Sequence, residues 1–263
     1  MTASLSDNQE STPESESAPI PKPGSKELPS IFDILLYSAT LTKRHANDVY
    51  GFTGYLLLPL ILFFGVQGIP GTLGDTIVTI VNVLSIILSL WVAACICTLV
   101  SLKTSNPKKE HDPRSISAHA MSILGILCTA VLLSSVIQLA GYLLIIPGIL
   151  ATILLTFTFE EVVLRGHGPI SALAASKARV QHQILGIGWR LLGIVLAFLL
   201  VYTTVSTGIL LLGAWATGTA ATVFVQHTPL WIDAILTVIE LVFIPPMIIA
   251  HTVLYLASSP EKE

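Results

Sequence analysis

Charged residues are scarce in this chain. Asp, Glu, Lys and Arg make up 11% of its 263 residues, whereas 53% are hydrophobic. Soluble domains carry roughly a quarter of their residues as these four types, so a water-soluble globular protein is close to excluded. The net charge of −3 leaves no basic surface for nucleic acid. Because Cys95, Cys97 and Cys128 all lie in apolar runs, a disulfide-stapled secreted domain is excluded as well.

What the chain has instead is a series of long, uncharged apolar runs. A transmembrane helix needs about 20 mostly apolar residues, and the runs 115–159 and 191–232 are too long for one crossing each. Pro147 and Gly148 divide the first of these runs. The sequence therefore predicts an all-α polytopic membrane protein with six spans, at about 49–72, 76–102, 118–142, 147–163, 184–207 and 231–256.

Proline and small residues are expected to change the course of the chain in two segments. Pro245 and Pro246 are expected to interrupt the last span. The segment 208–226 is short and rich in Gly, Ala and Thr, so we interpret it as a re-entrant or interfacial hairpin on the outer side.

Most basic residues of the predicted membrane domain lie in alternate loops. Lys and Arg precede the first span and follow the second and fourth spans, whereas the turns near 69–75, 142–147 and 226–230 have none. The positive-inside rule then places both termini in the cytoplasm, which requires an even number of crossings. We therefore expect a multi-pass protein of the bacterial inner membrane.

The remaining segments are expected to lie outside the lipid core. Residues 1–29 combine Ser, Pro and Glu with few large apolar residues, which predicts a disordered cytoplasmic tail. A membrane domain follows over 30–257, and 258–263 form a short cytoplasmic tail. The segment 30–47 and the segment that starts at Pro169 have the patterns of two interfacial amphipathic helices.

Two short motifs point to a family. The string LLIIPGILATILL at 143–155, followed by FEEVVLRGHGPISALAAS at 159–176, resembles the membrane domain associated with some bacterial glycerophosphodiester phosphodiesterases and the related YciC-type inner-membrane proteins. The ending TVLY at 252–255 resembles the end of that family. Arg165 departs from the pattern, because an acidic residue is more usual there. The resemblance implies a membrane fold without catalysis, since the soluble catalytic barrel of those enzymes needs roughly 250 further residues.

Ionisable side chains inside the predicted spans are the first candidate functional residues. At 100° per residue, Asp233, Glu240 and His251 project within about 20° of one line along the last span. This intramembrane polar stripe is expected to face protein or water. In the alternative interpretation, Glu240 is a structural group that is protonated or bonded to another helix, for example at Asn82 or Gln138.

A second set of ionisable residues lies around the fourth and fifth spans. Glu160 and Glu161 precede Arg165 at helical spacing, which is typical of an ion pair at the interface. The alternative is a set of contacts with lipid headgroups. The candidates for such contacts are Glu160, Glu161, Arg165, Lys177, Arg179 and Arg190.

The sequence carries no catalytic, metal or cofactor motif that we recognise. Its histidines lack the HExxH spacing, and Cys95 and Cys97 point apart on a helix. We therefore expect a non-enzymatic membrane protein without cofactor, which binds lipid or supports the homeostasis of the cell envelope. A small transporter or channel that uses an intramembrane carboxylate is the alternative, and an intramembrane enzyme comes third. Membrane lipids are the expected partners; protein partners and a homo-oligomer are left open.

Overall fold

The fold is entirely helical over the residues that the structure, a computed structural model, describes: 28–66, 71–105, 123–143, 145–218 and 228–258. The tails predicted at 1–29 and 258–263 lie almost wholly outside these residues. The helices are α1 (Ile31–Arg44), α2 (Ala46–Gly54), α3 (Leu57–Val66), α4 (Thr72–Ser105), α6 (Ile123–Leu143), α7 (Ile145–Leu154), α8 (Thr158–Arg165), α9 (Pro169–Val180), α10 (Ile184–Thr217) and α12 (Leu230–Ala257). The all-α class is confirmed for this part of the chain.

Five helical segments are long and apolar enough to cross a membrane, which supports the membrane class. They are Ala46–Val66, Thr72–Ser105, Ile145–Arg165, Ile184–Thr217 and Leu230–Ala257. The apolar part of α6, Gly125–Leu139, is shorter than the about 20 residues that a crossing needs. Two of the five segments are interrupted helices, because α2 gives way to α3 near Tyr55 and α7 gives way to α8 near Phe157.

The hairpin expected at 208–226 is wrong in its first half. Residues 208–217 continue α10, which runs for 34 residues to Thr217 and ends at Gly218 with φ of 64°. Inside a membrane every backbone N–H and C=O must be bonded, and a helix achieves this within one segment. Gly208 and Gly213 therefore stay helical. Residues 219–226 lie outside the described part of the chain.

The last span is not interrupted by its two prolines. Helix α12 is continuous over 28 residues with Pro245 and Pro246 inside it. Because Pro246 has no N–H, the carbonyl of Val242 loses its usual helical donor. The Tyr50 hydroxyl of α2 donates to that carbonyl over 3.4 Å, and the Ser38 hydroxyl of α1 donates to the Pro246 carbonyl over 2.6 Å. A hydroxyl of α2 thus satisfies the carbonyl that Pro246 leaves free, and α1 adds a hydrogen bond beside it.

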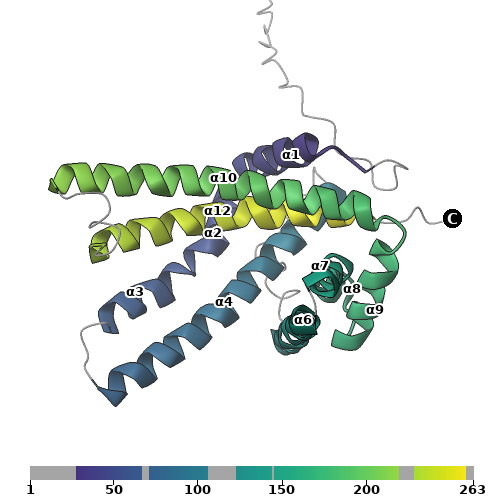
Figure 1. Cartoon of the computed structure of the whole chain (residues 1–263), viewed down its shortest axis with the longest axis horizontal. Helices are drawn as coiled ribbons and strands as arrows, with labels where there is room; N and C mark the ends of the chain where they lie inside the picture. The colour runs from purple at the N-terminus through teal and green to yellow at the C-terminus, as the bar shows by residue number, and fades with distance from the viewer. Residues whose placement is uncertain (1–27, 67–70, 106–122, 144, 219–227, 259–263) are drawn as a thin grey trace, which may run out of the picture.

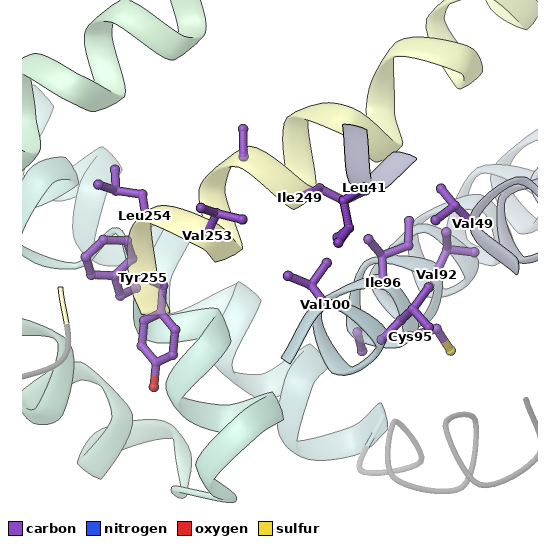
Figure 2. Packing of buried hydrophobic residues seen from close by; sticks show 14 of the residues in the cluster. Leu41, Val49, Val92, Cys95, Ile96, Val100, Ile249, Val253, Leu254 and Tyr255 are labelled. Atoms are coloured by element: carbon purple, nitrogen blue, oxygen red, sulfur yellow. The ribbon is translucent and has the colours of Figure 1, made fainter. Parts of the chain in front are cut away.

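The buried core lies at one end of the bundle (Figure 1). In Figure 2 the residues that pack together come from α1, α2, the last part of α4 and the last part of α12: Leu41, Val49, Val92, Cys95, Ile96, Val100, Ile249, Val253, Leu254 and Tyr255. Before Val92, only Gly74 and Val81 of α4 are buried. In Figure 1, α3 and α4 diverge from α10 and α12 toward the other end. The helices therefore share one core at one end, whereas at the other end, which we call the open end, α3 and α4 separate from α10 and α12, which still pack on each other through Ala214 and Ile232.

Both helices predicted to be amphipathic are present. Helix α1 begins with a capping box, in which the Ser30 hydroxyl accepts from the Asp33 N–H over 3.1 Å. Its buried side packs on α12 and α10, and a Cβ on Gly193 of α10 would come within 2.4 Å of Ile31. Helix α9 has Pro169 in its first turn. Close helix packing therefore holds α1 against the bundle.

Candidate functional site

The candidate site is built around the break between α7 and α8. The three residues 155–157 leave the helix, which frees backbone groups that need partners. The Ser176 hydroxyl of α9, fully buried, accepts from the Phe157 N–H over 3.1 Å and donates to the Leu154 carbonyl over 2.9 Å. A single side chain thus bridges the two helix ends, and α8 starts in a defined orientation.

Two adjacent glutamates occupy the first turn of α8 and are both buried. Glu160 is 2% exposed and Glu161 is 1% exposed. The amino-terminal end of a helix carries partial positive charge, which stabilises carboxylates in its first turn. That effect does not suffice for two buried charges, so each carboxylate needs partners from other helices.

Arg179 of α9 is the principal partner of Glu161. Its Nε and Nη2 atoms each lie 2.9 Å from Glu161 Oε1. The guanidinium carbon lies 4.2 Å from the centre of the Tyr255 ring, and Nη2 donates to the Tyr255 hydroxyl over 3.3 Å. The other oxygen, Glu161 Oε2, lies 3.1 Å from His167 Nδ1 and 3.7 Å from Arg165 Nε. Neither contact has the geometry of a hydrogen bond. The Arg179 side chain is only 4% exposed, so this ion pair is buried.

His251 of α12 is the partner of Glu160. Its Nδ1 lies 2.5 Å from Glu160 Oε1, and its Nε2 lies 3.0 Å from the Thr156 hydroxyl. The ring also packs against Phe157, with 5.5 Å between the ring centres. The second oxygen, Glu160 Oε2, is buried and has no hydrogen-bond partner among the described residues. The pair therefore has one acceptor that the described protein atoms leave unused.

A cavity of about 210 Å³ lies beside this pair. Glu160 and His251 line it together with Cys97 of α4 and with apolar side chains of α8, α10 and α12. The Cys97 sulfur lies 3.2 Å from the Thr252 hydroxyl. The cavity is apolar apart from these groups, so its polar end is the Glu160 and His251 pair.

The candidates for headgroup contacts fall into two groups. Arg165 and Lys177 are exposed, as such contacts require. Arg179 is held in the buried ion pair, and Arg190 donates to the carbonyls of Pro29 and Leu28 over 2.6 and 2.7 Å. Burial leaves Glu160 and Glu161 almost no surface to offer a headgroup. Four of the six residues are thus occupied inside the protein.

The structure does not bring the three residues of the polar stripe together. Asp233, Glu240 and His251 each line a different cavity. Glu240 is exposed and lines a cavity of about 230 Å³ between α10 and α12. Within the described part of the chain the Glu240 carboxylate has no hydrogen-bond partner. The bonds to Asn82 or Gln138 that the alternative interpretation expected are therefore not formed.

Asp233 lines a cleft of about 490 Å³ between α3, α4 and α12. Thr237 lies one helical turn after Asp233, and across the cleft α4 contributes Asn82, Ser85 and Ser89. Spacings of three and four residues place these side chains on one face of each helix. The cleft thus has two facing polar stripes.

Most of these cleft groups have no protein partner. Among the described residues, the side chains of Asp233, Asn82, Ser85 and Ser89 make no hydrogen bond to protein. The sequence pattern predicted Asn82 only as a partner for Glu240, and neither serine was among the predicted site residues. The sequence pattern that could have identified them is the i, i+3, i+7 spacing of Asn82, Ser85 and Ser89 within an otherwise apolar span.

Comparison with protein families, curated proteins and solved structures found no match for this chain. The resemblance to the phosphodiesterase-associated and YciC-type membrane domains therefore stays a prediction. Inferences about function rest on the geometry of the chain itself.

Proposed function

We propose that the chain is a non-enzymatic, multi-pass protein of the bacterial inner membrane that transports a small cationic solute through the cleft between α3, α4 and α12. In this proposal both termini are cytoplasmic, which requires an even number of crossings. The sixth crossing is then assigned to α6, although its apolar part, Gly125–Leu139, is shorter than about 20 residues. The turns at the open end of the bundle contain no Lys or Arg, so the cleft would open to the outer side. The buried core would then close the cytoplasmic side.

The observation that carries the proposal is the set of unpartnered polar groups in the cleft. Polar side chains are costly in hydrocarbon and usually face protein, water or a ligand when they lie in a span. Here the side chains of Asp233, Asn82, Ser85 and Ser89 face a space of about 490 Å³ and make no hydrogen bond to the described protein residues, whereas the Thr237 hydroxyl donates to the Asp233 carbonyl. Water or a polar solute in the cleft would satisfy them.

The charge of the cleft favours a cation. Asp233 is the one charged side chain among the residues that line it in the described part of the chain. It lies in the first turn of α12, where the partial positive charge of the helix end stabilises the ionised carboxylate. An amide and hydroxyl groups complete the lining, and they can bind a polar solute without adding charge.

Replacing Asp233 by Asn tests this proposal. Purified protein in liposomes with an inside-negative potential is expected to take up ethidium, a small organic cation, faster than empty liposomes. Asp233→Asn keeps the shape of the side chain but removes its charge, so uptake is expected to fall at least tenfold, which corresponds to a loss of about 1.4 kcal/mol.

Asp75→Asn is the matched control. Asp75 also lies in the first turn of a candidate span, is exposed, and does not line the cleft. Its replacement is expected to leave uptake unchanged. If Asp233→Asn transports like the parent, or if the parent transports no better than empty liposomes, the proposal is wrong.

Lipid binding is a second candidate function, favoured by the elbow between α8 and α9. Arg165 ends α8, Ile170 lies in the first turn of α9 and Lys177 in its last turn; all three are exposed, Ile170 by 78%. An apolar side chain flanked by basic residues suits an anionic lipid surface, and a role in the homeostasis of the envelope would follow.

A double replacement tests this candidate. Arg165→Gln with Lys177→Gln is expected to lower the amount of phosphatidylglycerol that the protein retains in native mass spectrometry. Lys43→Gln with Arg44→Gln makes the same change of charge at the end of α1 and serves as the control. Equal loss of lipid in both double variants would count against a specific site at the elbow.

A further inference from the structure

The cavity beside Glu160 is not isolated. It shares two wall residues, Val195 of α10 and Met247 of α12, with the cavity that Glu240 lines. The two cavities, of about 210 and 230 Å³, therefore follow one another along the contact between α10 and α12. We refer to them together as the α10–α12 groove. It shares no lining residue with the cleft at Asp233.

The groove has the length of one lipid chain. Glu240 and His251, which mark its two ends, are eleven residues apart on α12, or about 16 Å at the rise of an α-helix. The hydrocarbon part of one leaflet is about 15 Å, half of a bilayer core of about 30 Å. Val195 is 53% exposed and Met247 is 43% exposed, so the groove is open along its side.

The two ends of the groove differ in burial, because Glu240 at one end is exposed and Glu160 at the other is 2% exposed. Glu160 lines the cavity at this end, and its Oε2 is a buried acceptor without a hydrogen-bond partner among the described residues, which is unfavourable. Apolar side chains such as Phe159, Ile194 and Ile248 line the rest of this cavity. A ligand that fits must combine a hydrocarbon chain with a polar end that donates a hydrogen bond.

We propose that the α10–α12 groove binds a single-chain amphiphile whose ammonium or hydroxyl head donates a hydrogen bond to Glu160 while its chain lies against Val195 and Met247. A carboxylate head is disfavoured, because it would bring a third carboxylate next to Glu160 and Glu161. This binding does not depend on transport through the cleft at Asp233.

The test is the binding of radiolabelled dodecylamine to the full-length protein in phosphatidylcholine nanodiscs, with empty nanodiscs as background. Saturable binding near one molecule per protein is expected. 1-Dodecanol is expected to compete and dodecanoate is not. Glu160→Gln, which removes the charge, is expected to weaken binding at least tenfold.

Val195→Trp fills the shared wall of the groove and is expected to abolish the saturable binding. Because Val195 is exposed, this variant leaves the buried core in place. Val201→Trp, on an exposed position of α10 that lines neither cavity, is the matched control and is expected to bind like the parent. The proposal is overturned if the parent shows no saturable binding, if either Val195→Trp or Glu160→Gln binds like the parent, or if dodecanoate competes as well as 1-dodecanol.

Discussion

Arg179→Met is expected to lower the free energy of unfolding by about 3–5 kcal/mol. Methionine keeps apolar volume against Tyr255 but leaves the Glu161 carboxylate, 1% exposed, without its principal partner. A buried charge whose partner is removed destabilises a protein far more than the loss of an exposed pair. Equilibrium unfolding by SDS in mixed micelles measures this change.

Two further variants identify the cause of that loss. Arg165→Met removes a partner that lies 3.7 Å from Glu161 with a side chain 49% exposed, so a change of about 0–1 kcal/mol is expected. Adding Glu161→Leu to Arg179→Met removes the unpaired charge, and the double variant is expected to be more stable than Arg179→Met alone. If Arg179→Met and Arg165→Met are equally stable, the pair with Arg179 does not support the fold as described.

His251→Phe is expected to cost about 2–3 kcal/mol of unfolding free energy, because it removes a hydrogen bond to a carboxylate. Phenylalanine keeps a ring against Phe157, but it leaves both oxygens of Glu160 without a partner in the described part of the chain. The same unfolding titration measures the effect.

Thr156→Val is the control for this prediction. It removes only the neutral partner of His251 Nε2, at 3.0 Å, so a loss of about 1 kcal/mol is expected. The interpretation fails if His251→Phe is no less stable than Thr156→Val, since the bond to the Glu160 carboxylate would then contribute nothing extra.

The sequence predicted the helices better than it predicted their ends. Long apolar runs specify helices because backbone groups inside a membrane must bond within their own segment. The same constraint keeps 208–217 helical, where the Gly, Ala and Thr content predicted a hairpin. It also carries α12 through Pro245 and Pro246, where the effect of proline on a helix predicted an interruption. Hydrogen bonds from other helices, here from the Tyr50 and Ser38 hydroxyls, stabilise α12 near its prolines.

The candidate site was only partly predictable. Glu160, Glu161, Arg179 and His251 were all named as candidates, but the pairs that they form join residues 18 and 91 positions apart. Helical spacing identifies only neighbours within one helix. It therefore predicted an ion pair between Glu161 and Arg165 and missed the pair with Arg179. The polar face of α4 was readable, because Asn82, Ser85 and Ser89 recur at helical spacing within one span.

Transport through the cleft at Asp233 requires the cleft to hold water in the membrane, and the accessibility of Ser85 to a water-soluble reagent measures this. In a chain with Cys95, Cys97 and Cys128 replaced by Ala, Ser85→Cys lines the cleft. Ile86→Cys, at the next position of α4, is 57% exposed in the protein but does not line the cleft. Thiols react as thiolates, which form in water and not in hydrocarbon.

The measurement is the rate at which a membrane-impermeant methanethiosulfonate reagent, added from the outer side of intact cells, modifies each thiol. We expect Ser85→Cys to react at least tenfold faster than Ile86→Cys. Equal, slow rates for the two thiols would show that lipid or protein fills the cleft, and would contradict the account.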